Sequence, residues 1–160
     1  MIEARDHLLH FAGPTQRDQV ELLYTDNALE LIAAAKSLGW CHDHSEPEDP
    51  TSNAIGERNV RHMKEGLTTR MENGGAWPWF WEFAGAHFAH SCNIDTTKEL
   101  TPWEDRHKKG PFQGPQIPFF AGVDYLPPKS YQRLLPMADT KAVPGVFLGY
   151  KLHSGCTWNN

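Results

Sequence analysis

The chain has 160 residues, of which 39% are hydrophobic, and its formal net charge is −5. This length allows one domain with a core, or one domain with a small appendage, and the apolar content excludes a wholly disordered polypeptide. No apolar run approaches the roughly 20 residues that cross a bilayer, so we expect no membrane partner.

The charged residues are distributed unevenly along the chain. Residues 1–50 hold 3 basic and 10 acidic side chains, which sum to −7, whereas residues 51–160 hold 12 basic and 10 acidic ones, which sum to +2. A basic surface for nucleic acid, if the chain has one, is therefore expected to be local and to lie beyond residue 50.

The first part of the chain predicts alternating helices and strands. Gly13-Pro14 and Gly39 are stop signals for helices. In chain order we expect a helix over residues 1–13, a strand over 20–24, a helix over 28–38, a brief strand over 40–44 and a loop over 45–50.

A long helix is predicted next, from Ser52 or Asn53, which are good N-caps, to about Asn73 before a Gly-Gly pair. Four apolar residues recur at helical spacing and form the expected buried stripe: Val60, Met63, Leu67 and Met71. A second helix is expected over residues 78–93, with Pro78 in its first turn.

The segment from Trp77 to Phe83 contains three Trp and two Phe residues. We expect these rings to belong to the core or to be covered by a partner, and stacking on nucleic-acid bases is the alternative.

Beyond Thr101 the composition changes to Gly/Pro-rich stretches with β-like runs at 117–125 and 143–152. We therefore divide the chain into modules 1–100 and 101–160.

Two acidic residues have positions that suit a divalent cation. Asp26 lies where a predicted strand ends, and Glu57 lies in the first turns of the long helix. A strand-end Asp and a helix-borne Glu can converge on Mg²⁺ or Mn²⁺, which take oxygen ligands and leave positions for substrate phosphate. The alternative for Asp26 is a turn or helix cap.

Basic residues follow Glu57 on the same predicted helix. At about 100° per residue, Glu57, Arg61 and Lys64 share one face, and Arg58 flanks it. This face suits DNA phosphates beside a bound metal ion. A solvated face with i,i+4 ion pairs is the alternative.

The three cysteines, Cys41, Cys92 and Cys156, are odd in number and widely spaced, so we expect reduced thiols in an intracellular protein, nuclear or cytoplasmic. A zinc site is a further alternative, because several Cys and His residues are present. Its donors would come from Cys41, His42, Asp43, His44, His87, His90 and Cys92, whose spacing fits no common zinc finger.

Five segments of the sequence, taken in order, resemble the integrase of copia-type (Ty1/copia) retrotransposons. The first contains Thr25-Asp26-Asn27, and the second runs from Asn53 through Glu57-Arg58 to Arg61. The others are Leu38-Gly39-Trp40 with the proline-containing loop after it, Thr101-Pro102-Trp103-Glu104, and Gly145-Val146-Phe147-Leu148-Gly149-Tyr150. Together they cover about residues 20–150.

The resemblance implies an α/β fold: an RNase H-like core truncated at its N-terminal strands, with a small β-containing C-terminal appendage. It also implies 3′-end processing and joining of element DNA to host DNA by two-metal polynucleotidyl transfer. Asp26 corresponds to the second catalytic Asp and Glu57 to the catalytic Glu, both as metal ligands. The expected DNA contacts are Asn53, Arg58, Arg61 and Lys64.

Only 25 residues precede Asp26, which leaves no room for the strand that carries the family's first catalytic Asp. We therefore expect the chain to be inactive by itself, and we expect its partners to be DNA and either a second copy or a complementing integrase segment. The alternative function is a non-catalytic nucleic-acid-binding or assembly module, domesticated or a relic of a degraded element.

Overall fold

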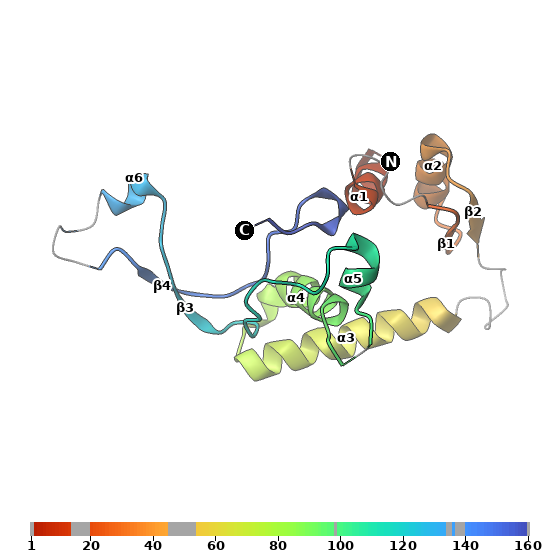
Figure 1. Ribbon diagram of the computed structural model, residues 1–160. Coiled ribbons are helices and arrows are strands. Elements are labelled where there is room, and N and C mark those ends of the chain that lie inside the picture. The colour runs from red at the N-terminus through yellow and green to blue at the C-terminus, as the bar shows by residue number, and fades with distance from the viewer. Residues whose placement is uncertain are drawn as a thin grey trace. The chain divides into compact units, whose positions relative to one another are not determined.

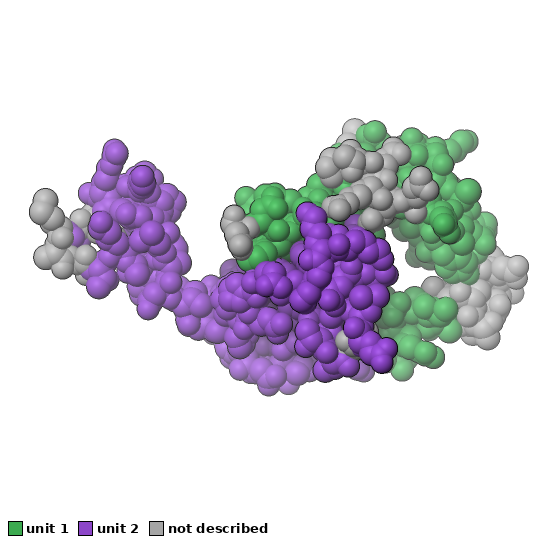
Figure 2. Space-filling view, viewed as in Figure 1, with its two compact units in different colours: residues 1–62, 151–160 green, residues 63–150 purple. Residues whose placement is uncertain are grey.

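A computed structural model describes residues 2–13, 20–44, 54–97, 99–133, 136 and 140–159 (Figure 1). The chain packs into two compact units, which Figure 2 shows in different colours. Unit 1 contains residues 1–62 and 151–160, and unit 2 contains residues 63–150. These two units differ from the modules 1–100 and 101–160 that the sequence predicts. The boundary near residue 100 stays a prediction.

Unit 1 contains a parallel β-α-β element. Strand β1 (Leu23–Thr25) pairs with β2 (His42–His44), with Leu23 opposite His42 and Thr25 opposite His44. Parallel strands need a crossover between them, and α2 (Leu29–Leu38) provides it. Gly39 ends this helix in the left-handed conformation, with φ 69°, as the sequence predicts.

Helix α1 (Ile2–Ala12) confirms the predicted first helix and packs against α2 and against η2 (Ser154–Cys156). Small residues permit the close approach of these segments. Ala12 of α1 and Ala34 and Ala35 of α2 are buried. The backbones of Gly13 and Gly155 nearly touch, because a Cβ on Gly13 would lie 3.2 Å from the Cα of Gly155.

Helix α3 (Ala54–Gly74) is the predicted long helix, and its residues are divided between unit 1 and unit 2 after His62. The expected buried stripe is only partly present. Met63, Leu67 and Met71 are half-buried, whereas Val60 is 53% exposed, and no residue of α3 is fully buried. The predicted N-cap residues Ser52 and Asn53 and the predicted loop at 45–50 lie outside the described residues.

The core of unit 2 is formed around α4 (Trp81–Asn93), which follows the 3₁₀ turn η1 (Pro78–Phe80). Ala84, His87 and His90 are its buried residues. Helix α5 (Pro102–His107) packs beside it and begins with a capping box. The Thr101 hydroxyl accepts the Glu104 N–H at 3.1 Å, and the Glu104 carboxylate accepts the Thr101 N–H at 3.1 Å.

Both predicted β-like runs after residue 100 contain a strand, shorter than the run, and the two strands form an antiparallel pair. Strand β3 (Gly122–Tyr125) pairs with β4 (Val143–Val146), with Gly122 opposite Val146. The short helix α6 (Lys129–Gln132) lies between them in the sequence. Among the helices that the structure describes, none is long and apolar enough to cross a bilayer.

Candidate functional site

Asp26 directly follows the last residue of β1, as the sequence predicts, and its side chain is exposed. Two hydrogen bonds involve this residue, one at its backbone carbonyl and one at its carboxylate. The Thr25 hydroxyl donates to the Asp26 carbonyl oxygen at 2.8 Å, and Asp26 Oδ1 accepts a long bond of 3.4 Å from the Ala28 N–H. The contact between Asp26 Oδ1 and the N–H two residues further on is the turn that the sequence offers as the alternative for Asp26.

Glu57 lies in the first turn of α3 and is also exposed. Neither carboxylate forms an ion pair with a basic side chain in the part of the chain that the structure describes. Both carboxylates offer oxygen atoms, the type of ligand that Mg²⁺ or Mn²⁺ takes, but among the described residues no group of three His, Cys, Asp or Glu side chains gathers around a common point. The segment 45–53, which joins β2 to α3, lies outside the described residues.

The expected basic face of α3 is present on the helix surface. Arg58, Arg61 and Lys64 are exposed, and no described acidic side chain pairs with them, so the Glu57–Arg61 ion pair of the solvated-face alternative is not formed. One turn beyond Lys64, the Thr68 hydroxyl donates to the Lys64 carbonyl oxygen at 2.9 Å. These three side chains therefore present their positive charges to solvent. Asn53, the fourth expected DNA contact, lies outside the described residues.

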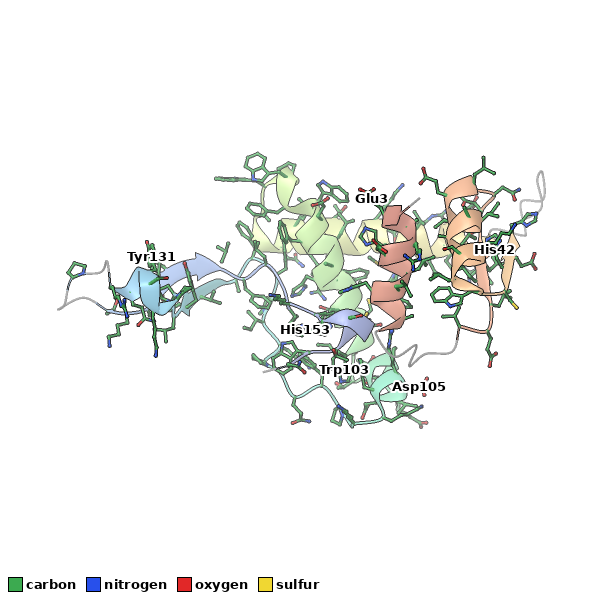
Figure 3. The ribbon with its side chains drawn as sticks, turned by 90° about the horizontal axis from the view of Figure 1, so that it is seen from above. Glu3, His42, Trp103, Asp105, Tyr131 and His153 are labelled. Atoms are coloured by element: carbon green, nitrogen blue, oxygen red, sulfur yellow. The ribbon has the colours of Figure 1, made fainter. Side chains whose placement is uncertain are left out.

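His42 on β2 contacts the strand that precedes Asp26, which the sequence did not predict. Its Nε2 lies 2.8 Å from Thr25 Oγ1, across the parallel pair of β1 and β2; His42 is labelled in Figure 3. Thr25 therefore links the His42 ring to the backbone of Asp26. The signal that could have found it is strand alternation combined with the parallel register, which places residue 42 on the same sheet face as residues 23 and 25.

The zinc alternative is not supported, because no three His, Cys, Asp or Glu residues gather at a common point among the described residues. His87 and His90 of α4 are instead buried in unit 2. His87 Nε2 donates to the Ile117 carbonyl oxygen at 3.0 Å. His90 lies among three aromatic rings, with centroid distances of 5.7 Å to Trp103, 5.0 Å to Phe112 and 4.6 Å to Tyr150.

Burial governs the protonation of these two histidines. Loss of hydration on burial, with a smaller contribution from the positive charge that His87 can carry, lowers the pKa of His90 to about 4. Burial also lowers the pKa of His87, while its hydrogen bond to Ile117 opposes this effect and the charge of Arg70 adds to it. Both rings are therefore neutral at pH 7, and they serve as packed core residues.

The Trp77–Phe83 rings were expected in the core or under a partner, and the core placement is wrong for most of them. Trp77, Trp79, Trp81 and Phe83 are 61%, 65%, 56% and 47% exposed, and only Phe80 is half-buried, in edge contact with Phe120. The helical spacing was interpreted correctly, but α4 buries its Ala84, His87 and His90 side instead. The exposed rings form an aromatic patch on unit 2.

No protein-family model and no curated protein matches the sequence. A solved structure with a similar chain is the cryo-EM structure of the simian T-cell lymphotropic virus intasome in complex with PP2A regulatory subunit B56 gamma. The match has a TM-score of 0.50 and 20% identity, and it covers 90% of this chain and 52% of the other, so this chain spans about half of that protein's length. At this identity the likeness concerns the fold alone: the chain folds like a chain of a retroviral intasome complex.

Proposed function

We propose that the chain forms part of the catalytic core of a copia-type retrotransposon integrase, with an RNase H-like fold. The observation that carries the proposal is the order β1-α2-β2-α3, in which Asp26 ends the first strand and Glu57 begins the long helix. The ordered sequence motifs and the similarity in fold to a retroviral intasome chain support it. The complete enzyme would process and join DNA ends.

In this proposal Asp26 and Glu57 converge on Mg²⁺ or Mn²⁺ and hold it with their carboxylate oxygens. A divalent ion bound there would activate the attacking oxygen and stabilise the leaving oxygen of a phosphodiester. Arg61 and Lys64 lie one and two turns beyond Glu57 on α3 and would hold DNA phosphates, with Arg58 beside them. Asn53 completes the set of proposed DNA contacts.

Two carboxylates provide fewer ligands than the three that the resemblance implies. We therefore expect no strand transfer by the 160-residue polypeptide alone, and we propose that a complementing integrase segment provides the remaining Asp. Metal-dependent nicking of DNA by the purified polypeptide, abolished by Glu57→Gln, would contradict this part of the proposal.

A DNA-binding experiment tests the nucleic-acid part of the proposal. We expect the chain to bind a short DNA duplex weakly in a fluorescence-anisotropy titration. Its affinity should decrease steeply as the salt concentration rises from about 50 to about 200 mM. The double variant Arg61→Glu/Lys64→Glu should weaken binding and reduce the slope of log affinity against log salt by about 2, because two phosphate contacts are lost.

The matched control is Lys36→Glu/Lys129→Glu, which changes the net charge equally at two exposed residues of α2 and α6. The control should keep the slope of the original chain. Equal loss in both double variants would show that net charge, and not the face of α3, determines binding.

The exposed aromatic patch favours one alternative function, an assembly module that associates with a second copy. Aromatic side chains contribute much of the buried area and binding energy of protein interfaces. The patch residues Trp77, Trp79, Trp81 and Phe83 are adjacent to one acidic residue, Glu82, and to no basic one within 76–86, which is unfavourable for DNA. Stable self-association without salt-sensitive DNA binding would favour this alternative.

A further inference from the structure

We propose that the outer edge of β3 pairs with the same edge of a second copy of this chain, so that two hairpins form one four-stranded antiparallel sheet. Strands β3 and β4 form a two-stranded sheet within unit 2 and lie side by side in Figure 1. Two-stranded sheets are only marginally stable, and further strands stabilise them. The proposed interface includes neither the Asp26–Glu57 site nor the aromatic patch.

The hydrogen bonds of Phe147, which directly follows β4, show which backbone groups of the hairpin face its partner strand. The Phe147 N–H donates to the Ala121 carbonyl oxygen at 2.9 Å, and the Phe147 carbonyl oxygen accepts the Phe120 N–H at 2.7 Å. In an antiparallel pair, residues that bond the partner strand alternate with residues that face away from it. The preceding residue, Val146, therefore directs its N–H and C=O away from β3.

The same alternation, continued through the register, defines the two edges of the sheet. Gly122 lies opposite Val146, and Asp124 lies opposite Pro144, so these four residues direct their backbone groups outward. Pro144 has no N–H, which blunts the β4 edge as a template for another strand. The β3 edge offers an N–H and a C=O at both of its outward residues. Among the described residues, no strand and no backbone hydrogen bond occupies that edge.

Two copies of β3 complement each other in one antiparallel register. When Gly122 of each copy lies opposite Asp124 of the other, both of these symmetry-related pairs exchange two hydrogen bonds. Val123, which is half-buried in the single chain, then faces Val123 of the other copy. The two Asp124 carboxylates lie diagonally, about 7–8 Å apart, and so oppose the pairing less than directly facing charges would.

The side chains on one face of the hairpin favour the same register. Val123 and Tyr125 project from this face, and the Tyr125 ring covers Gly145, because a Cβ added at Gly145 would lie 3.3 Å from the ring. The ring is nevertheless 48% exposed. In the proposed register Tyr125 lies opposite Ala121 of the second copy, so apolar side chains meet apolar ones along the new edge. We therefore infer that the partner strand is β3 itself.

Cysteine cross-linking of the full chain tests the register. In a background with Cys41, Cys92 and Cys156 replaced by serine, Val123→Cys should form a covalent dimer on mild oxidation. Facing residues in a non-hydrogen-bonded pair have Cα atoms about 4.5 Å apart, within the range of about 4.4–6.8 Å that a disulfide spans. Asp124→Cys is the matched control and should remain mainly monomeric, because its two copies lie diagonally. No cross-link at residue 123, or equal cross-linking at both positions, would overturn the proposal.

Sedimentation equilibrium tests the edge itself. Asp124→Pro removes an outward N–H from β3 and should raise the dimer dissociation constant at least tenfold. Val146→Pro removes an outward N–H from β4 and should leave it unchanged, since proline is tolerated where an edge N–H faces solvent. Asp124→Asn keeps the N–H without the charge and should dimerise at least as tightly as the original chain. This variant separates loss of the hydrogen bond from loss of the side chain.

One further variant distinguishes this interface from self-association through the aromatic patch. Trp79→Ala removes an exposed ring of the patch and should not change the dissociation constant of the dimer. A dimer that persists in Asp124→Pro, or that is lost in Trp79→Ala, would refute pairing through β3.

Discussion

The phenyl ring of Phe88 on α4 lies against the Cα of Gly66 on α3, so close that a Cβ at residue 66 would lie 2.2 Å from the nearest ring carbon. Glycine in the middle of a helix is unfavourable by about 1 kcal/mol relative to alanine. At residue 66 the missing side chain leaves the space that the Phe88 ring occupies. The contact fixes how α4 packs on the second half of α3.

Gly66→Ala should therefore destabilise the protein, although alanine is the better helix former. Overpacking costs about 1–3 kcal/mol and the gain in helix propensity is about 1 kcal/mol, so we expect a net loss of up to about 2 kcal/mol in urea unfolding. Gly85→Ala is the control, because no heavy atom lies within 4 Å of its added Cβ in α4. It should be neutral or stabilising. Equal stability of the two variants would contradict the packing.

Removal of the α5 capping box should also reduce stability. Thr101 is 2% exposed, and its hydroxyl accepts the Glu104 N–H. Thr101→Ala leaves that N–H without its partner and should cost about 1–2 kcal/mol in thermal or urea unfolding. Thr101→Ser retains the hydroxyl and should recover most of the loss. If serine were no better than alanine, the methyl group and not the cap would stabilise this turn.

The buried His90 should make the fold sensitive to acid. Because its folded-state pKa is lowered to about 4 from about 6.5, the unfolded chain binds the proton first as the pH falls. The free energy of unfolding should therefore keep its full value above pH 6.5, where His90 is neutral in both states, and should decrease as the pH falls from 6.5 to 4. At pH 4 the decrease approaches about 3 kcal/mol.

Unfolding free energies measured at several pH values test this expectation. His90→Leu should flatten the dependence between pH 6.5 and 4, with a residual slope from His87, whose pKa is also lowered. His153→Gln, at an exposed position, should keep the original profile. If His90→Leu leaves the slope unchanged, protonation of His90 does not govern acid sensitivity.

The Tyr150 hydroxyl connects two distant parts of unit 2. It donates to the Pro115 carbonyl oxygen at 2.5 Å and accepts the Ile117 N–H at 3.0 Å. Tyr150→Phe removes both bonds while keeping the ring, so we expect a loss of about 1–3 kcal/mol in unfolding free energy. Tyr131→Phe, at an exposed tyrosine of α6, should change little. A similar effect of both substitutions would argue against the hydroxyl bridge.

Local sequence signals predicted the elements that hold the candidate site. Gly39 has the left-handed conformation that ends α2, and the strands predicted over residues 20–24 and 40–44 are present as β1 and β2, within a few residues of those bounds. The Thr-Pro-x-Glu segment proved to be a capping box, which explains its residue types without reference to DNA. Such features depend on residues within one turn of each other.

Features that depend on contacts between distant segments were predicted less well. The spacing of aromatic residues in α4 did not reveal that the side with Ala84, His87 and His90 is buried. Nor did it show that Trp79 and Trp81 are exposed. The contact of Thr25 with His42 follows from a parallel register, which no local signal specifies. A helix has several faces, and only packing decides which one is covered.

The proposed carboxylate pair predicts how Mn²⁺ binding responds to neutral substitutions. Asp26→Asn and Glu57→Gln should each weaken Mn²⁺ binding about tenfold, or about 1.4 kcal/mol, because each removes one charged ligand from the same ion. The measurement is an EPR titration that reports the concentration of free Mn²⁺. Glu65→Gln, an exposed substitution two turns further along α3, should have little effect. If only one of the two site variants binds Mn²⁺ more weakly, Asp26 and Glu57 do not share a cation.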